Sequence, residues 1–218
     1  MELDQRTKSE FGATARRILE HARQAFNERG VASVGIREIA RDLDLSPGNV
    51  SYHFPTKEAL VVALVEKAHA QNNARAAPAG SLDFESLLAI LHDIMRRDLD
   101  NRWLMRDCVG LLTTLPALRP LTEKMQRARE ARVDGITRRL VAAGLLDRVR
   151  TEKQLPHLRR QVLTQVIFWL PMAILAAPDR DPEGSLETHA RTVLALFLAY
   201  VTPTGRRRLE SLLGRERA

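Results

Sequence analysis

Apolar side chains recur at helical spacing along the first third of the chain. Between residues 14 and 28 an apolar residue returns every three or four positions, with charged residues between. The members of this stripe are Ala15, Ile18, Leu19, Ala22, Ala25 and Phe26. The spacing predicts one amphipathic helix that ends near Gly30. A second stripe, at i, i+3, i+4 and i+7, predicts a helix of about eight residues that carries Ile36, Ile39, Ala40 and Leu43.

The stretch SPGNVSYHF, residues 46–54, predicts another short helix. Ser46 is a good N-cap, and Pro47 suits the first helical position because its missing N–H has no partner there in any case. Val50 and Phe54 are one turn apart and are expected to face inward. The predicted outward residues are Gly48, Asn49, Ser51 and Tyr52.

Thr56 is expected to cap a longer helix, KEALVVALVEKAHAQ, and the Ala-, Pro- and Gly-rich segment 72–81 predicts a domain boundary. The two expected domains are therefore residues 1–72 and 73–218. Further helical patterns cover residues 83–102, 104–115, 116–144, 152–177, 185–201 and 204–214, with Pro or Gly at the breaks. The prediction is an all-α protein of about nine to ten helices.

Composition supports this fold class and suggests a location. The chain has 218 residues, of which 44% are hydrophobic and 5% aromatic, a mixture that favours helices over β-rich architecture. A single cysteine, Cys108, and a charged N-terminus without an apolar core lead us to expect a cytoplasmic protein. The longest apolar run, residues 162–177, is shorter than the roughly 20 residues of a spanning helix, so no membrane contact is expected.

The net charge of +7 does not by itself locate a nucleic-acid site. Residues 1–72 contain 10 Lys and Arg against 10 Asp and Glu, so the whole surplus lies in residues 73–218. We interpret the basic runs Arg159–Arg160 and Arg206–Arg208 as solvated helix surface.

Two short helices, about 36–43 and 47–54, joined by a three-residue turn have the proportions of a helix-turn-helix. In that motif the second helix enters the major groove of DNA and presents its N-terminal residues to base edges. Residues 14–64 also resemble the N-terminal domain of TetR/AcrR-family transcriptional regulators, through ARRILEHARQAFNERG and VGIREIARDLDLSPGNVSYHFPTKEAL. The resemblance implies a homodimeric regulator, most simply a repressor, on a pseudo-palindromic double-stranded DNA operator.

The resemblance also implies which residues contact DNA. Arg37 matches a position that often contacts a base or phosphate, and its guanidinium suits guanine recognition. His53 and Lys57 match positions that commonly contact the phosphate backbone, and packing beneath the following helix is the alternative role for His53. The positions that match the recognition helix are Pro47, Gly48, Asn49, Ser51 and Tyr52.

Three departures from the family pattern affect this site. Val34 and Gly35 stand where a Thr often binds a phosphate, so only the Gly35 backbone N–H could do that work. Asp44 replaces a turn glycine, and it tolerates a left-handed backbone but brings a negative charge beside the DNA. The family commonly has a Tyr at the position of Ser51, whereas in this chain the Tyr comes one residue later, at Tyr52.

The resemblance also implies that the C-terminal domain binds an effector and forms the dimer. The dimer helices are predicted at about 160–177 and 185–201, with an apolar face formed by Leu186, Ala190, Val193, Leu194, Phe197, Leu198 and Val201. Aromatic and Met side chains with few polar groups are what a cavity for a small, largely hydrophobic molecule needs, and packing in a plain core is the alternative role for most of the candidates. The candidate lining residues are Leu88, Leu91, His92, Met95, Trp103, Met105, Cys108, Leu111, Leu112, Phe168, Trp169 and Met172.

No pattern in the chain predicts catalysis, a cofactor or a metal site. The six histidines are scattered, and none forms a ligand pair with Cys108 or a nearby carboxylate. No Gly-rich phosphate loop or nucleophile elbow is present. The alternative function that the sequence leaves open is a helical small-molecule-binding protein without specific DNA binding.

Overall fold

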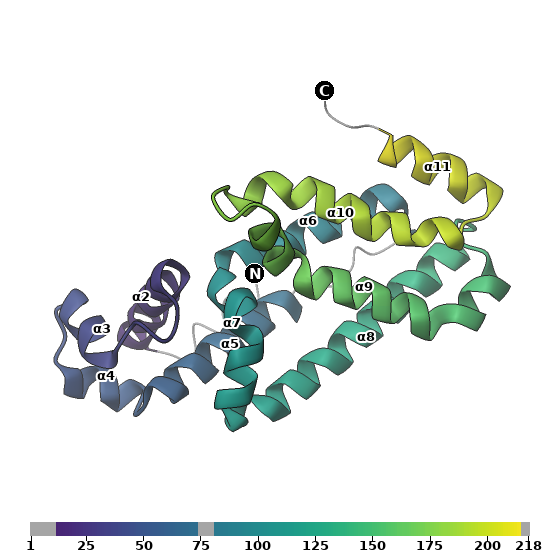
Figure 1. Ribbon diagram of the computed structural model, residues 1–218. Coiled ribbons are helices and arrows are strands. Elements are labelled where there is room, and N and C mark those ends of the chain that lie inside the picture. Colours follow the sequence, from purple (N-terminus) through teal and green to yellow (C-terminus); the bar gives the residue numbers. More distant parts are fainter. Residues whose placement is uncertain (1–11, 74–80, 215–218) are drawn as a thin grey trace. The chain divides into compact units, whose positions relative to one another are not determined.

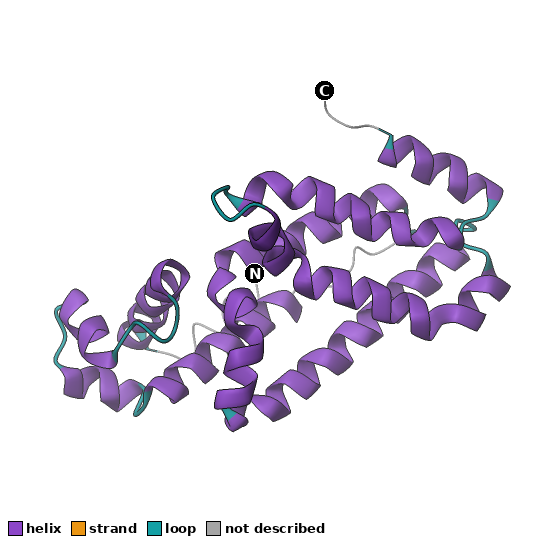
Figure 2. Ribbon diagram, in the orientation of Figure 1, coloured by secondary structure: helices purple, strands orange, loops and turns teal. Residues whose placement is uncertain are grey.

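The computed structural model describes residues 12–73 and 81–214, and across these residues it is built from helices (Figure 1). Figure 2 shows helices joined by short loops and no strand in this part of the chain. The α-helices are α2 (Ala13–Arg29), α3 (Ile36–Asp42), α4 (Pro47–His53), α5 (Lys57–Asn73), α6 (Phe84–Asp100), α7 (Arg102–Thr114), α8 (Arg119–Ala142), α9 (Arg148–Ala176), α10 (Leu186–Ala195) and α11 (Pro203–Leu213). The all-α prediction is confirmed.

The chain divides into two compact units. Unit 1 comprises Met1–Arg75 and Asp100–Lys124, and unit 2 comprises Ala76–Leu99 and Met125–Ala218. Helix α7 therefore groups with the N-terminal helices, although it follows α6 along the chain. Most of the predicted linker, residues 74–80, lies outside the described residues, so the boundary near residue 72 stays a prediction.

The core of unit 1 gathers on the predicted stripe of α2. All six of its apolar residues are buried, and Ile18, Ala22 and Phe26 have no exposed surface. Helices α3, α4, α5 and α7 all contact α2. The hydrophobic pattern thus identified the helix around which this unit is assembled.

The turn between α3 and α4 has the hydrogen bonds of a Schellman motif. The N–H of Leu45 donates to the carbonyl of Ala40 over 2.9 Å, and the N–H of Asp44 donates to the carbonyl of Arg41 over 3.1 Å. Asp44 has a φ of 55°, the left-handed conformation that the sequence led us to expect there. A residue with a Cβ therefore occupies the backbone position that favours glycine.

In unit 2, α8 and α9 form an antiparallel hairpin, α10 packs against α9, and α11 packs against α10 (Figure 1). The hairpin turn is tied to the start of α11, because the Thr202 hydroxyl donates to the carbonyl of Gly144 over 2.7 Å. A Cβ on Gly205 would lie 2.0 Å from the carbonyl oxygen of Leu145. Only glycine allows this approach of α11. Helix α9 begins at Arg148, with Asp147 as its N-cap, one turn before the predicted start.

The apolar stripe expected to form a dimer face on residues 185–201 is covered within the chain. Leu186, Ala190, Val193, Leu194, Phe197 and Val201 are buried, and Leu198 is half-buried. The periodicity identified the face correctly, but the face packs against other parts of the same protomer. Within the described residues, no helix is long and apolar enough to cross a membrane.

We predict that Asp44→Gly stabilises the protein. Glycine adopts the φ of 55° without the Cβ clash, so the free energy of unfolding should rise by roughly 0.5–1 kcal/mol. Urea unfolding measures the change. Asp42→Gly, two residues earlier and inside α3, is the matched control and should destabilise the protein. A loss of stability in Asp44→Gly would contradict the role of this turn.

Candidate functional site

Helix α4 is held at both ends and along its inner edge. The hydroxyl of Ser46 accepts a hydrogen bond from the N–H of Asn49 over 3.1 Å, and Pro47 occupies the first turn. Val50 is fully buried, and Phe54, which ends the helix, is 3% exposed. These contacts confirm the predicted cap and inner edge, and they leave the opposite side of a short helix free.

The outer side of α4 and the start of α3 are open to solvent. The exposed residues include Gly35, Arg37, Pro47, Gly48, Asn49, Ser51 and Tyr52. Tyr52 is 83% exposed, which is unusual for a large aromatic side chain. The seven predicted contact residues at the start of α3 and on α4 are therefore all exposed, and their side chains are short or flat except for one guanidinium. We call this set of residues the recognition face.

His53 and Lys57 have contacts of their own inside unit 1. His53 is half-buried, and its ring meets the ring of Tyr52 edge-on with centroids 5.2 Å apart. The ammonium of Lys57 donates to the carbonyl of Ala32 over 3.2 Å, which ties the start of α5 to the loop before α3. Thr56 caps α5 by accepting from the N–H of Ala59 over 3.1 Å. The phosphate contacts expected of His53 and Lys57 stay predictions.

The backbone N–H of Gly35 is directed at a carboxylate. It donates to Oε2 of Glu38 over 3.5 Å, and the other oxygen of that carboxylate pairs with Arg29. The hydrogen bond from Arg29 holds the pKa of Glu38 below its usual value, so the negative charge is retained. A phosphate bound at Gly35 would have to compete with this carboxylate.

The residues predicted to line an effector cavity are divided between the two units. Unit 1 contains Trp103, Met105, Cys108, Leu111 and Leu112, and unit 2 contains Leu88, Leu91, His92, Met95, Phe168, Trp169 and Met172. Trp103 is fully buried and lies against Phe26 of α2, with ring centroids 5.7 Å apart. In unit 2, Met95 and Trp169 are buried, whereas Phe168 and Met172 are 41% and 55% exposed. A single cavity lined by all of them stays a prediction.

A buried carboxylate that the sequence did not single out lies next to one of these candidates. Asp98 of α6 is 7% exposed and accepts a hydrogen bond from the indole N–H of Trp169 over 2.9 Å. Burial raises the pKa of Asp98 to about 7, although the Trp169 bond and two arginines oppose the shift. The two residues are 71 positions apart, so no local pattern could have paired them.

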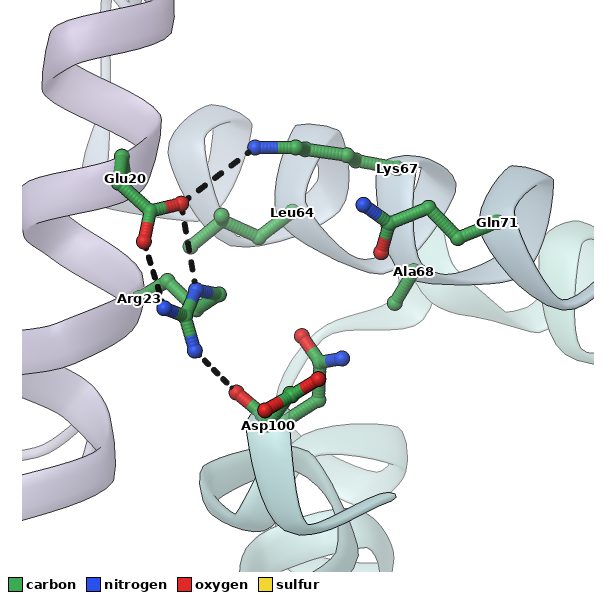
Figure 3. Close-up of a pocket in the computed structure, with 8 residues that line it drawn as sticks. Glu20, Arg23, Leu64, Lys67, Ala68, Gln71 and Asp100 are labelled. Atoms are coloured by element: carbon green, nitrogen blue, oxygen red, sulfur yellow. Dashed lines mark hydrogen bonds and ion pairs between the residues drawn. The ribbon is translucent and has the colours of Figure 1, made fainter. Parts of the chain in front are cut away.

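Among the hollows in the described parts of the units, one in unit 1 and one in unit 2 have polar linings. The one in unit 1 has a volume of about 230 Å³ and lies between α2, α5 and the α6–α7 turn (Figure 3). Figure 3 shows Arg23 between the carboxylate of Glu20 and the backbone of Asp100, with Lys67 paired to Glu20 at 3.7 Å. The one in unit 2 has a volume of about 250 Å³ and lies between α8 and α9, where Arg159 is among its lining residues.

Two family models cover most of the chain. Residues 18–64 match the model described as "Bacterial regulatory proteins, tetR family", and residues 67–209 match the TetR model described as "Bacterial transcriptional repressor". This chain belongs to the TetR family. It is a DNA-binding transcriptional regulator rather than an enzyme.

Individual TetR-type relatives agree with this assignment. The chain is 38% identical over 58 residues to the HTH-type transcriptional regulator UidR of Escherichia coli (strain K12), a match that covers 27% of this chain and only 30% of UidR. It is 27% identical over 163 residues to the HTH-type transcriptional repressor Rv1474c of Mycobacterium tuberculosis (strain ATCC 25618 / H37Rv), covering 74% of this chain and 78% of that protein.

A solved structure shows the same fold across nearly the whole chain. The crystal structure of a TetR-family transcriptional regulator from Marinobacter aquaeolei VT8 matches with a TM-score of 0.84. The match covers 95% of this chain and 100% of the other, at 22% sequence identity. The fold of a TetR-family regulator is therefore preserved where most side chains differ.

We predict that Asp98 makes stability fall as the pH rises. Its pKa of about 7 in the folded protein lies above the ordinary 3.8, so between these values the folded state binds more protons than the unfolded chain. The free energy of unfolding should therefore fall by up to roughly 1.4 kcal/mol per pH unit between these two pKa values. Above the higher value the ionisation of Asp98 should cause no further change.

Asp98→Asn tests this prediction, because an amide oxygen still accepts from Trp169 but cannot ionise. Urea unfolding at about pH 5 and about pH 8 should show that the variant gains stability relative to the wild type at the higher pH. Asp179→Asn, at an exposed position, is the control and should change little. Equal pH dependence in Asp98→Asn and the wild type would contradict the buried ionisation.

Proposed function

We propose that this TetR-family chain is a cytoplasmic repressor that binds a pseudo-palindromic operator as a homodimer and is released by a small, largely hydrophobic ligand. The observation that carries the proposal is that α4 exposes its part of the recognition face on one side and is anchored by Val50 and Phe54 on the other. The major groove of DNA admits an α-helix. A short helix that is held rigidly on one side can present the exposed polar residues of its other side to base edges.

On the operator, the recognition face supplies base contacts and its flanks supply phosphate contacts. Arg37 binds a guanine edge through two hydrogen bonds, and Asn49, Ser51 and Tyr52 read neighbouring bases. His53 and Lys57 approach the phosphate backbone beside the groove. Lys57 does so from the start of α5, where the helix dipole also favours an anion.

The dimer forms through the faces of α9 and α10 that the protomer leaves uncovered. Phe168, Met172 and Leu175 lie on one side of α9 and are 41%, 55% and 75% exposed. An exposed apolar stripe of this kind favours association with an apolar surface of similar length on a second protomer. On α10 and the residues that follow it, the exposed positions Thr188, Thr192 and Ala199 are small, so a partner helix can approach closely.

The effector binds within unit 2, where α6 and α9 contribute apolar side chains and few polar groups. Met95 and Trp169 are buried there, and the carboxyl of Asp98 with the indole N–H is a polar pair that could orient a ligand. Ligand binding that favours one arrangement of the dimer would change the spacing of the two α4 helices. Both half-sites can be occupied only at the correct spacing, so the operator is released.

Two substitutions distinguish base contacts from phosphate contacts. Arg37→Ala should reduce discrimination between the operator and mismatched duplexes by about 1–3 kcal/mol, whereas Lys57→Ala should weaken all sequences alike. Fluorescence anisotropy with operator and mutated duplexes measures both effects. Arg138→Ala, an exposed arginine of α8 in unit 2, is the control and should leave binding unchanged. If neither variant altered operator affinity, a small-molecule-binding protein without specific DNA binding would be the better account.

Met172→Glu tests the dimer surface. A carboxylate at this position would be buried without a partner in the dimer, so the variant should sediment as a monomer where the wild type is a dimer. Val149→Glu is the matched control, since Val149 is 77% exposed on the first turn of α9, away from the stripe. Dissociation of both variants, or of the control alone, would place the interface elsewhere.

A further inference from the structure

A single side chain of α2 holds both sides of the turn between α6 and α7. The amide nitrogen of Asn27 donates to the carbonyl of Asp100 over 2.9 Å. The amide oxygen of the same side chain accepts from the backbone N–H of Trp103 over 3.0 Å. Asn27 thus binds the last residue of α6 and the first turn of α7 at once. We call this pair of hydrogen bonds the Asn27 bridge.

The bridge replaces a cap that α7 lacks. The first backbone N–H groups of a helix have no partner within the helix, and a side chain at the N-cap usually binds one of them. Asn101 stands at the N-cap of α7, but its side chain makes no capping hydrogen bond. The N–H of Trp103 is bound instead by a residue 76 positions earlier in the chain.

Further contacts fix α7 on α2 around the bridge. The guanidinium of Arg23 also donates to the carbonyl of Asp100, as Figure 3 shows. The guanidinium of Arg106 donates to the carbonyl of Phe26 over 3.1 Å, and the ring of Phe26 contacts the fully buried Trp103. The segment Asp100–Lys124 accordingly belongs to unit 1 rather than to the unit that contains the rest of α6.

We propose that Asn27 is a positioning residue that makes α7 part of the same cooperative body as the recognition helix. The chain passes from unit 2 to unit 1 at residues 99–100, which is where the bridge holds it on α2. A rearrangement of α6 is therefore transmitted through the covalent joint to α2, and operator binding is transmitted in the opposite direction. This inference rests on the proposed DNA-binding function and assigns the residue that couples it to the rest of the chain.

Hydrogen exchange with and without operator tests the coupling. The duplex is one recovered by selection from a random pool, and it is added to a free concentration of about 100 times its Kd. In the wild type, exchange by opening of unit 1 should slow by up to about 100-fold in α3, in α4 and in the first turn of α7. In Asn27→Ala, the operator should still slow exchange in α3 and α4. In the first turn of α7 of this variant, adding the operator should change the exchange rate by less than about threefold.

Two further variants control for lost stability. Asn27→Asp keeps an oxygen that accepts from Trp103 but loses the donor to Asp100, so it should restore part of the operator-dependent protection in α7. Gln24→Ala removes an exposed amide of α2 that donates to Glu20 of the same helix, and the variant should behave as the wild type.

The outcomes separate this inference from the function on which it rests. If the operator slowed exchange in α7 of Asn27→Ala as much as in the wild type, the inference would be overturned. It would also be overturned if, in the wild type, the operator slowed exchange in α3 and α4 but not in α7. In both cases the DNA-binding function would stand. If α3 and α4 showed no operator-dependent protection in any variant, the proposed function would fail and the inference with it.

Discussion

The burial of one edge of α4 in unit 1 is the constraint on which the recognition face depends. The helix has seven residues, too few to be stable in water without tertiary contacts. Val50 and Phe54 supply those contacts, and the left-handed turn at Asp44 sets where the helix starts. Because the inner edge and both ends are fixed, the outer residues are presented in one arrangement before any DNA arrives. That preorganisation lowers the entropic cost of binding.

Features encoded by neighbouring residues could be predicted from the sequence. The stripe of α2, the cap at Ser46, the inward positions of α4 and the unusual residue at Asp44 all depend on spacing or chemistry within a few residues, and the structure contains each of them. The exposure of the recognition face followed from the same helical geometry. Which bases and phosphates it contacts depends on DNA and on side-chain rotamers, so those roles stay predictions.

Features that join distant residues could not be predicted in the same way. Periodicity shows that a helix face is apolar but does not show what covers it, so the stripe on residues 185–201 gave no means of choosing between a partner chain and the chain's own core. Trp103 suited a ligand cavity by its chemistry, yet it packs on Phe26 of α2. The bonds between Asp98 and Trp169 and between Asn27 and Trp103 each span more than 70 residues.

The Asn27 bridge lies within unit 1, beside the point at which the chain passes into unit 2. The recognition face belongs to helices near the N-terminus, but residues 100–124 complete the unit that supports it. A regulator needs such a connection, because an effector bound in one region must change the free energy of DNA binding in another. In the coupling proposed above, the connection is made by hydrogen bonds between Asn27 and backbone groups, which depend on position more than on the identity of the residues bound.

The central claim is that α4 reads DNA as one of a symmetric pair, and selection of duplexes from a random pool by the purified protein tests it most directly. The account predicts an inverted repeat whose half-site centres lie one helical turn of about 34–36 Å, or a multiple of it, apart. Affinity for that sequence should fall steeply with salt, with a slope of about −0.9 for each phosphate contact. Recovery of an asymmetric sequence, or no enrichment over the starting pool, would contradict the account.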